Sequence, residues 1–490
     1  MARPQLRPQL RPQVRPLVRP EPRPGTAQAE PWPGFAWTRH AVAVEDAAED
    51  GAQRTLFPRL ISMPAAYGQG GAEAFAGLAP AAASLADAVE PLLRAWRRAG
   101  LARGVLPGPE EAEGLFASLR LQLGTARGAP DAALWQGVRG AEPRWVLDLA
   151  AFVEPSQDIA AAALARAVGQ AMTALELAGP HGPDRAVAVV PANLAGALMA
   201  AGIAYASAEG RATAAALVAL VLGTAVEASA GLARRLSPCP AWIERRAPVL
   251  ATLEGLFDRL PHGAPAALAA EASAALDRGL AAARRHGLRQ LGLVALAGPG
   301  PVERMLGADS AGAEPMPAIV RHEEGERGRP VRVLARPAQR AIAALGLAPE
   351  EERAAIAAIL GTGTLDGAPE EALLALAASG IDPVALERHL PGAVSLAHAA
   401  ALADPDRDLP DTPALAALER LAIGTGTAEA APHLPEATRA ALAAGATAAA
   451  RAAMAEAVAP FLGLGLAEKL RSLRRRAAAR SAPPKLAAAS

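Results

Sequence analysis

Apolar residues recur at helical spacing along most of this chain, for example in Ala72–Arg98 and Glu110–Gly124. At Pro349–Glu352 a proline and three acids open another such segment, which suits the first turn of a helix and its positive dipole end. Apolar residues make up 52% of the 490 residues and are mostly Ala and Leu, whereas aromatic residues make up 3%. Because Ala is the strongest helix former, helices should dominate the fold.

Strand candidates are few and short: Ala186–Val190, Leu291–Leu296 and Val331–Ala335. We therefore predict an α/β fold that is helix-dominated. The two most apolar windows, Ala186–Ala206 and Ala212–Ala225, are rich in Ala rather than Leu, and each contains or runs into a polar side chain. This composition favours buried helices over membrane spans.

The charge balance and the cysteine content exclude several classes of protein. The chain carries 49 basic and 49 acidic residues, so no net field attracts nucleic acid or an anionic membrane. Cys239 is the one cysteine, which excludes a disulfide framework and a thiolate-rich metal site within one subunit. The eight histidines lack metal-ligand spacing, and the start of the chain lacks an apolar signal-peptide core. We expect a cytoplasmic protein with no resident metal.

Both ends of the chain are basic. Residues 3–24 repeat Arg-Pro every four residues, which enforces extended polyproline II structure and forbids helix. At the other end, Arg471–Arg480 holds five arginines before Pro483. We interpret residues 1–34 as a disordered arm and 471–490 as a basic tail, both solvated. Docking of the arm on an acidic surface or an aromatic-lined groove remains an alternative, as does phosphate or partner binding by the tail.

One internal repeat is visible. The segment Gly361–Pro369, which begins Gly-Thr-Gly-Thr, recurs at Gly424–Pro432, and each copy follows a predicted helix. Glycine directly after a helix suits a left-handed cap, and the threonines with a following acid and proline suit a tight turn. We predict structural caps, with phosphate binding by these turns as the alternative.

Several blocks resemble, in the same order, segments of class II, adenosylcobalamin-dependent ribonucleotide reductases. The segment Pro191–Met199, followed by Tyr205 to Arg211, is similar to the family's Y-A-N-L-G-A-L-L-M … Y-D-S-D-E-G-R stretch. Both Gly/Thr turns resemble the family's G-T-L-E-G-A-P and E-G-A-P-H-L runs. Further similar blocks are Glu110–Leu123, Ala129–Trp135, His286–Gln290, Gly312–Pro315, Leu390-Pro391 and Met454–Gly463. Together they extend over about two-thirds of the chain.

The resemblance implies a reductase-like barrel, but with parts missing. In the family a loop that carries the radical cysteine, and the first barrel strands, precede the segment that Trp145–Phe152 resembles. Here the short stretch from Trp135 to Phe152 cannot hold them. Reduction of a ribose needs a thiyl radical and two further thiols, with the radical furnished by the cofactor. Cys239 matches a helix-connecting turn of the family, so we assign no catalytic residue and expect no cofactor, adenosylcobalamin included.

The family's substrate-phosphate loop is also altered. Its A-P-T-G-T-I run corresponds to Ala297–Val302, where Pro299 and Pro301 replace both threonines and so remove two hydroxyls and two N–H donors. We therefore expect nucleotide binding to be weak or absent. Residues that the resemblance leaves as a remnant of the substrate site are Asn193, Gly300, Gly312 and Glu314.

These observations lead to a domain division and three hypotheses. We assign residues 1–34 to the arm, 35–139 to an N-terminal helical domain, 140–470 to a degenerate reductase-like barrel remnant and 471–490 to the tail. The first hypothesis is a catalytically inactive, reductase-like protein that acts by contact with a protein partner or with itself. The alternatives are a residual ribonucleoside-diphosphate reductase-type enzyme, or a nucleotide or cobalamin binder, that works with another chain, and a purely structural helical adaptor.

Overall fold

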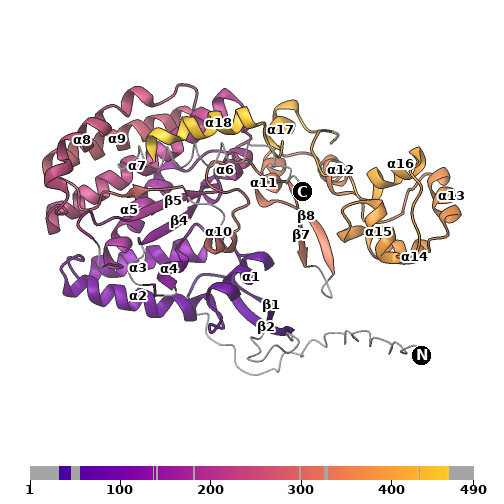
Figure 1. Ribbon diagram of the computed structural model, residues 1–490, viewed down its shortest axis with the longest axis horizontal. Coiled ribbons are helices and arrows are strands. Elements are labelled where there is room, and N and C mark those ends of the chain that lie inside the picture. The colour runs from indigo at the N-terminus through magenta and orange to yellow at the C-terminus, as the bar shows by residue number, and fades with distance from the viewer. Residues whose placement is uncertain are drawn as a thin grey trace, which may run out of the picture.

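The computed structural model describes residues 32–45, 56–135, 137–138, 142–179, 182–296, 300–324, 329–429 and 431–462. The predicted Arg-Pro arm and basic tail lie outside the described residues, as do Ala297–Pro299 of the altered loop. Helices surround a small central sheet, and a group of four helices projects from this body (Figure 1). The prediction of a helix-dominated α/β fold is confirmed.

The central sheet has four strands in the order β3-β4-β5-β6. β3 runs antiparallel to β4, whereas β4, β5 and β6 are parallel. Within the described ranges no further strand pairs with β3 or β6, so this sheet is open. β1 pairs with β2, and β7 with β8, as separate antiparallel hairpins. The strands are β1 (Trp37–Glu45), β2 (Leu56–Pro64), β3 (Gly128–Pro130), β4 (Arg144–Asp148), β5 (Ala188–Ala192), β6 (Leu293–Val294), β7 (Val320–Glu324) and β8 (Pro330–Leu334).

All three predicted strands exist, as β5, β6 and β8. The window Ala186–Ala206 is buried, as expected, but it is not a single helix. It forms β5 and then α6, because the β-branched pair Val189-Val190 favours a strand. The hairpin β1–β2 lies in the segment that we predicted to be helical, and is an addition to the predicted fold.

Helices account for most of the remaining described chain. They are α1 (Gln69–Leu78), α2 (Leu85–Ala102), α3 (Pro109–Gly124), α4 (Ala132–Trp135), α5 (Ala161–Leu177), α6 (Leu194–Ala200), α7 (Ala208–Leu236), α8 (Trp242–Glu254), α9 (Ala266–His286), α10 (Pro301–Leu306), α11 (Arg336–Ala343), α12 (Pro349–Leu360), α13 (Glu370–Ser379), α14 (Pro383–Glu387), α15 (Leu396–Ala403), α16 (Pro413–Ala422), α17 (Glu436–Ala441) and α18 (Ala448–Val458). The helical pattern of Ala72–Arg98 is interrupted between α1 and α2, where Pro80 cannot continue a helix and the Ser84 side chain caps the next one.

The long helix α7 is the core of the body. Its composition and length would suit a membrane span, but 83% of its most apolar window is buried inside the protein, as expected for Ala212–Ala225. α9 packs closely along it. A Cβ on Gly223 of α7 would lie 2.6 Å from the backbone of Leu276, so the two helices meet backbone to backbone. This close contact explains why small residues dominate α7.

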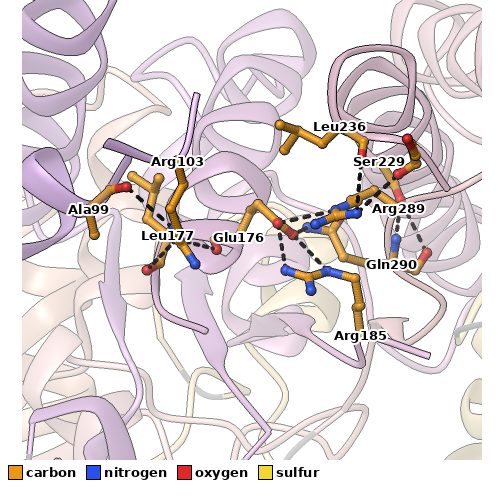
Figure 2. Close-up of polar contacts among 10 residues, drawn as sticks. Ala99, Arg103, Glu176, Leu177, Arg185, Ser229, Leu236, Arg289 and Gln290 are labelled. Carbon is orange, nitrogen blue, oxygen red and sulfur yellow. Dashed lines mark hydrogen bonds and ion pairs between the residues drawn. The ribbon is translucent and has the colours of Figure 1, made fainter. Parts of the chain in front are cut away.

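The buried carboxylate of Glu176 is the centre of a network of polar side chains (Figure 2). Glu176 of α5 accepts a hydrogen bond of 2.6 Å from Arg185, which precedes β5, and one of 3.2 Å from Arg289, which precedes β6. The Gln290 side chain donates to the second carboxylate oxygen at 3.0 Å, and its backbone N–H donates to Ser229 of α7 at 2.8 Å. This network fixes the amino ends of two parallel strands against α5 and α7.

We predict that Glu176→Gln destabilises the protein by about 3–5 kcal/mol, because two half-buried guanidinium groups would lose their counter-charge. Urea denaturation gives the free energy of unfolding. Glu254→Gln is the matched control, since the Glu254–Arg284 pair is about half exposed and should contribute about 0–1 kcal/mol. Equal effects of the two substitutions would contradict the structural role of the network.

The two Gly-Thr-Gly-Thr turns lie against each other and cap each other's helices. The backbone N–H groups of Thr362 and Gly363 donate to Leu421 and Ala422 at the end of α16. Those of Thr425 and Gly426 donate in return to Ala358 and Ile359 at the end of α12. The cap prediction is therefore confirmed, in a reciprocal form that satisfies carbonyls at the carboxyl ends of both helices.

These turns form the neck between the body and the four-helix module of α13–α16 (residues 365–422). Arg332 of β8 donates one guanidinium nitrogen to the carbonyls of both Leu360 and Ile423, and so ties the neck to the β7–β8 hairpin. The module has its own core, which includes Leu376, Leu386 and Leu418. In Figure 1 it lies at the end of the molecule away from the central sheet.

We predict that Gly361→Ala destabilises the protein by at least about 2 kcal/mol more than Gly367→Ala. Both glycines have a similar positive φ, 78° and 77°, but a Cβ on Gly361 would clash with the carbonyl of Ala422, whereas nothing lies within 4 Å of one on Gly367. Urea denaturation measures both variants, and limited proteolysis locates the change. If cleavage in the Gly361 variant is not concentrated at the neck, the proposed reciprocal capping is wrong.

Candidate functional site

Two polar side chains meet at the carboxyl ends of β4 and β5. Asp148 is the last residue of β4, and Asn193 follows β5 directly. Because these strands are parallel and in register, with Asp148 beside Ala192, both side chains emerge at one edge of the sheet. The Asn193 amide donates to the Asp148 carboxylate at 2.9 Å, and the backbone N–H of Ala150 donates to it at 3.1 Å. Asn193 has a left-handed backbone (φ 59°), which turns the chain from β5 into α6.

A cavity of about 250 Å³ opens at this edge. Asp148 and Asn193 line it together with three arginines, Arg127, Arg336 and Arg340. Arg336 and Arg340 lie four residues apart on α11 and so share one face of that helix. Arg127 comes from the turn before β3, next to Ala126, whose φ of 53° is unusual for a residue other than glycine.

Backbone carbonyl groups hold each guanidinium in place. Arg340 donates to Ala150 at 2.6 Å, Arg336 to Ala66 at 2.6 Å and Arg127 to Ala151 at 3.3 Å. Arg127 also stacks over the ring of Phe152, 5.3 Å from its centroid. Within the described part of the chain, none of the three arginines forms an ion pair with a carboxylate. The cavity is therefore cationic.

The single carboxyl group in this cavity is perturbed. Burial raises the pKa of Asp148 to about 7, against the hydrogen bonds from Asn193 and Ala150 and the attraction of Arg336, while the charge of Asp309 raises it further. Burial also lowers the pKa of Arg340, and the charge of Asp148 opposes that shift. Near neutral pH, Asp148 thus offsets the arginine charge only in part.

A second cavity of about 700 Å³ lies next to the first, and Gly307 and Arg336 line both. Its walls come from the start of α1, from α10 and from β7. They carry acids as well as arginines, and Asp309 pairs with Arg321 at 2.9 Å. Burial raises the pKa of Asp309, although Arg321 opposes the shift. The larger cavity is therefore lined by both acidic and basic side chains.

Of the four residues predicted to remain from a substrate site, Asn193 lines the first cavity. Gly300 is the residue before α10, Gly312 has a φ of 52° in a turn, and Glu314 donates its backbone N–H to Ala311 at 2.8 Å. The Tyr205 hydroxyl donates to Ala313 in the same turn at 2.6 Å. Gly300, Gly312 and Glu314 line neither of the two cavities.

The start of α10 is covered by an acidic side chain of the same helix, Glu303. The Glu303 side chain lies back over Gly300, where it is buried and accepts hydrogen bonds from the backbone N–H groups of Gly300 and of Glu303 itself. Burial raises the pKa of this carboxyl group, and those hydrogen bonds oppose the shift. The backbone N–H of Gly300 in the altered loop is thus engaged by the chain's own Glu303 side chain.

Cys239 lies at the opposite edge of the sheet. Its backbone N–H donates to Leu288, which precedes β6, and the N–H of Ala241 donates to Pro183, which precedes β5. These segments lead into the amino ends of the parallel strands, whereas the cavity lies at their carboxyl ends. The thiol is buried in the turn between α7 and α8, as predicted, and burial raises its pKa. Among the described residues, no three His, Cys, Asp or Glu side chains gather closely enough to hold a metal ion.

Comparisons with known proteins show which proteins this chain is similar to. A family model described as the barrel domain of ribonucleotide reductase matches residues 181–373. A vitamin B12-dependent ribonucleotide reductase from Agrobacterium fabrum is 30% identical over 198 residues, which cover 36% of this chain and 16% of that protein. The matched part of the chain is thus similar to the barrel domain of class II ribonucleotide reductases. Proteins of the same description from Bradyrhizobium diazoefficiens and Rhodopirellula baltica are 28% and 26% identical, over 42% and 36% of this chain.

The resemblance on which we based the family prediction is thus confirmed. Each match nevertheless covers less than a fifth of the reductase's own length, between 16% and 18%. Sequence reasoning missed the three arginines of the cavity, because the residues from Arg127 to Arg340 are brought together only by the fold. It also missed Asp148, although Trp145–Phe152 had been identified as a segment similar to the reductase family.

We predict that Asp148→Asn stabilises the protein at pH 8 by up to about 4 kcal/mol. The pKa of Asp148 is higher in the folded protein than its ordinary value in the unfolded chain. Asp148 therefore favours the folded state fully below about pH 4, and this contribution to stability is lost as the pH rises to about 7 and above. The difference between variant and wild type should therefore grow from pH 4 to pH 8 in urea denaturation. Asp277→Asn, on the exposed face of α9, is the control; a flat difference for Asp148→Asn would refute the raised pKa.

Proposed function

We propose that this chain is a catalytically inactive member of the reductase family that acts by protein–protein contact in the cytoplasm. The observation that carries the proposal is the position of the single thiol. Ribose reduction needs thiols beside the substrate. Cys239 lies buried at the amino edge of the sheet, opposite the cavity at the carboxyl edge. No side chain of this chain can take the place of the missing thiols, because it has one cysteine.

The residues present do not fit the family's cofactor chemistry. Adenosylcobalamin would have to generate a radical on a thiol, and the residues around the two cavities include none. The backbone N–H of Gly300 is engaged by Glu303, which supports weak or absent nucleotide binding at the altered loop. An open sheet of four strands supports our interpretation of a degenerate barrel.

The surface of the four-helix module supports a contact-based role. Half of the large apolar side chains that are exposed in the described chain lie on it, although it is a small part of the protein. They are Leu373, Leu374, Val384, Val394 and Leu402. A concentration of exposed apolar side chains on one small unit is typical of an interaction surface. We infer that this module binds a second copy of the chain or another protein.

One observation favours the alternative of a ligand-binding or residual enzymatic role together with another chain. The cationic cavity beside Asp148 and Asn193 is a formed concave site in the part that matches the reductase barrel. A purely structural adaptor would have no use for it. Enzymatic activity would still require thiols from a different subunit.

We predict that the purified protein, given adenosylcobalamin and a dithiol, converts no ribonucleotide to deoxyribonucleotide. Nucleoside di- and triphosphates should bind with dissociation constants weaker than about 1 mM in calorimetry, because Pro299 and Pro301 remove two hydroxyls and two N–H donors of the family's phosphate loop. A reductase of the same family serves as the positive control for the assay. Turnover that copurifies with the protein and survives Cys239→Ala would overturn the proposal of inactivity.

We also predict that the protein forms a homo-oligomer or a stable complex with another protein. Light scattering measures the mass, and Leu374→Glu together with Val384→Glu should release the monomer, because each replaces an exposed apolar side chain of the module with a charge. Ile243→Glu on α8, where Ile243 is 85% exposed, is the control and should leave the complex intact. A wild-type monomer at high concentration, with no partner recovered from cell extract, would rule out the contact role.

A further inference from the structure

In the described chain none of the three arginines of the smaller cavity forms an ion pair, although the charges of Asp309 and Glu154 act on Arg336 and Arg340 from farther away. All are half-buried, and the one carboxyl group among them, Asp148, titrates near neutral pH. Like charges held together away from bulk water repel each other, and burial of unpaired charge is costly. Proteins usually compensate such a cluster with acidic side chains, as Glu176 does for Arg185 and Arg289 in this same protein. The cavity has no equivalent acid.

The guanidinium groups are also oriented in advance. Each guanidinium donates a hydrogen bond from one nitrogen to a backbone carbonyl, at Ala66, Ala150 or Ala151. Its other N–H groups can therefore donate to another acceptor. Arginine presents these donors as a planar fork that matches two oxygens of a phosphate or carboxylate group. Side chains fixed before binding lose little entropy on binding.

We propose that this cavity binds a compact, dianionic oxoanion, either a free phosphate- or sulfate-like ion or the phosphate group of a small monoester. The volume of about 250 Å³ is below the range of about 300–1,000 Å³ that is typical of drug-sized ligands, so a small anion fits best. The site is separate from the altered loop at Gly300, where Glu303 already engages the backbone N–H. The proposal goes beyond the contact role and does not depend on it.

Calorimetry with sulfate, inorganic phosphate and glycerol 3-phosphate tests the proposal on the full chain. We expect a submillimolar dissociation constant for at least one of the three at pH 8. Similar affinities would identify a free oxoanion as the ligand, whereas markedly tighter binding of glycerol 3-phosphate would identify a monoester that extends toward the larger cavity beyond Arg336. Dissociation constants weaker than about 10 mM for all three would overturn the proposal.

The variants Arg336→Gln and Arg340→Gln should each weaken binding at least about tenfold, because each removes a charge-assisted donor. Arg285→Gln, at the exposed end of α9, is the matched control and should bind as the wild type does. Circular dichroism verifies that each variant is folded. Unchanged affinity in both cavity variants would place the bound anion elsewhere and refute this site.

Asp148→Asn provides a test in the opposite direction that does not depend on loss of a side chain. At pH 8 the substitution removes the negative charge that competes for the arginines, yet its amide oxygen can still accept from Asn193 and Ala150. Sulfate should then bind about threefold to tenfold more tightly. Weaker or equal binding would contradict an anion beside Asp148. Dissociation constants are compared rather than melting temperatures, because sulfate stabilises folded proteins in general.

Discussion

The Glu176 carboxylate is the contact on which the arrangement of the body depends. The segments that lead into β5 and β6 both bind this one group of α5, and Gln290 links it to Ser229 of α7. A parallel sheet has no short turns to align its strands, so their positions must be fixed by side chains and by the helices between them. At the carboxyl ends of β4 and β5 the corresponding side-chain link is the hydrogen bond from Asn193 to Asp148. That is where the cavity forms.

The two edges of the sheet, at the amino and carboxyl ends of its parallel strands, therefore differ in their chemistry. The amino edge is closed by paired charges and buries Cys239 as an apolar side chain. The carboxyl edge gathers unpaired arginines around Asp148 and Asn193. In open α/β sheets, ligands bind at the carboxyl edge. This chain keeps that polarity of the sheet, and Cys239 lines neither of the two cavities.

Local sequence patterns predicted what depends on nearby residues. The strand that became β5, the helix after Pro349 and the capping glycines of both Gly/Thr turns each follow from a few adjacent side chains. The patterns could not predict what depends on distant residues. Arg127 and Arg340 share a cavity only after β3, β4 and α11 have assembled, and the reciprocal capping of α12 and α16 is invisible in either turn alone. The hairpin β1–β2 was missed although its alternating Ala41–Val44 run is typical of a strand. The domain boundaries at 34/35, 139/140 and 470/471 remain predictions.

The paired neck has a consequence for how the chain tolerates change. Residues 365–422 leave the body and return to it at the same place, where the turns at Gly361 and Gly424 touch. The ends of the segment are held together whatever lies between them, so its length has little effect on the entropy of closing it. A helical unit of another length could join the body at the same two turns, but it would lose the close contact of Gly392 with Pro330 of β8. The neck is therefore a point at which a helical unit can be exchanged while the two ends of the segment stay beside each other.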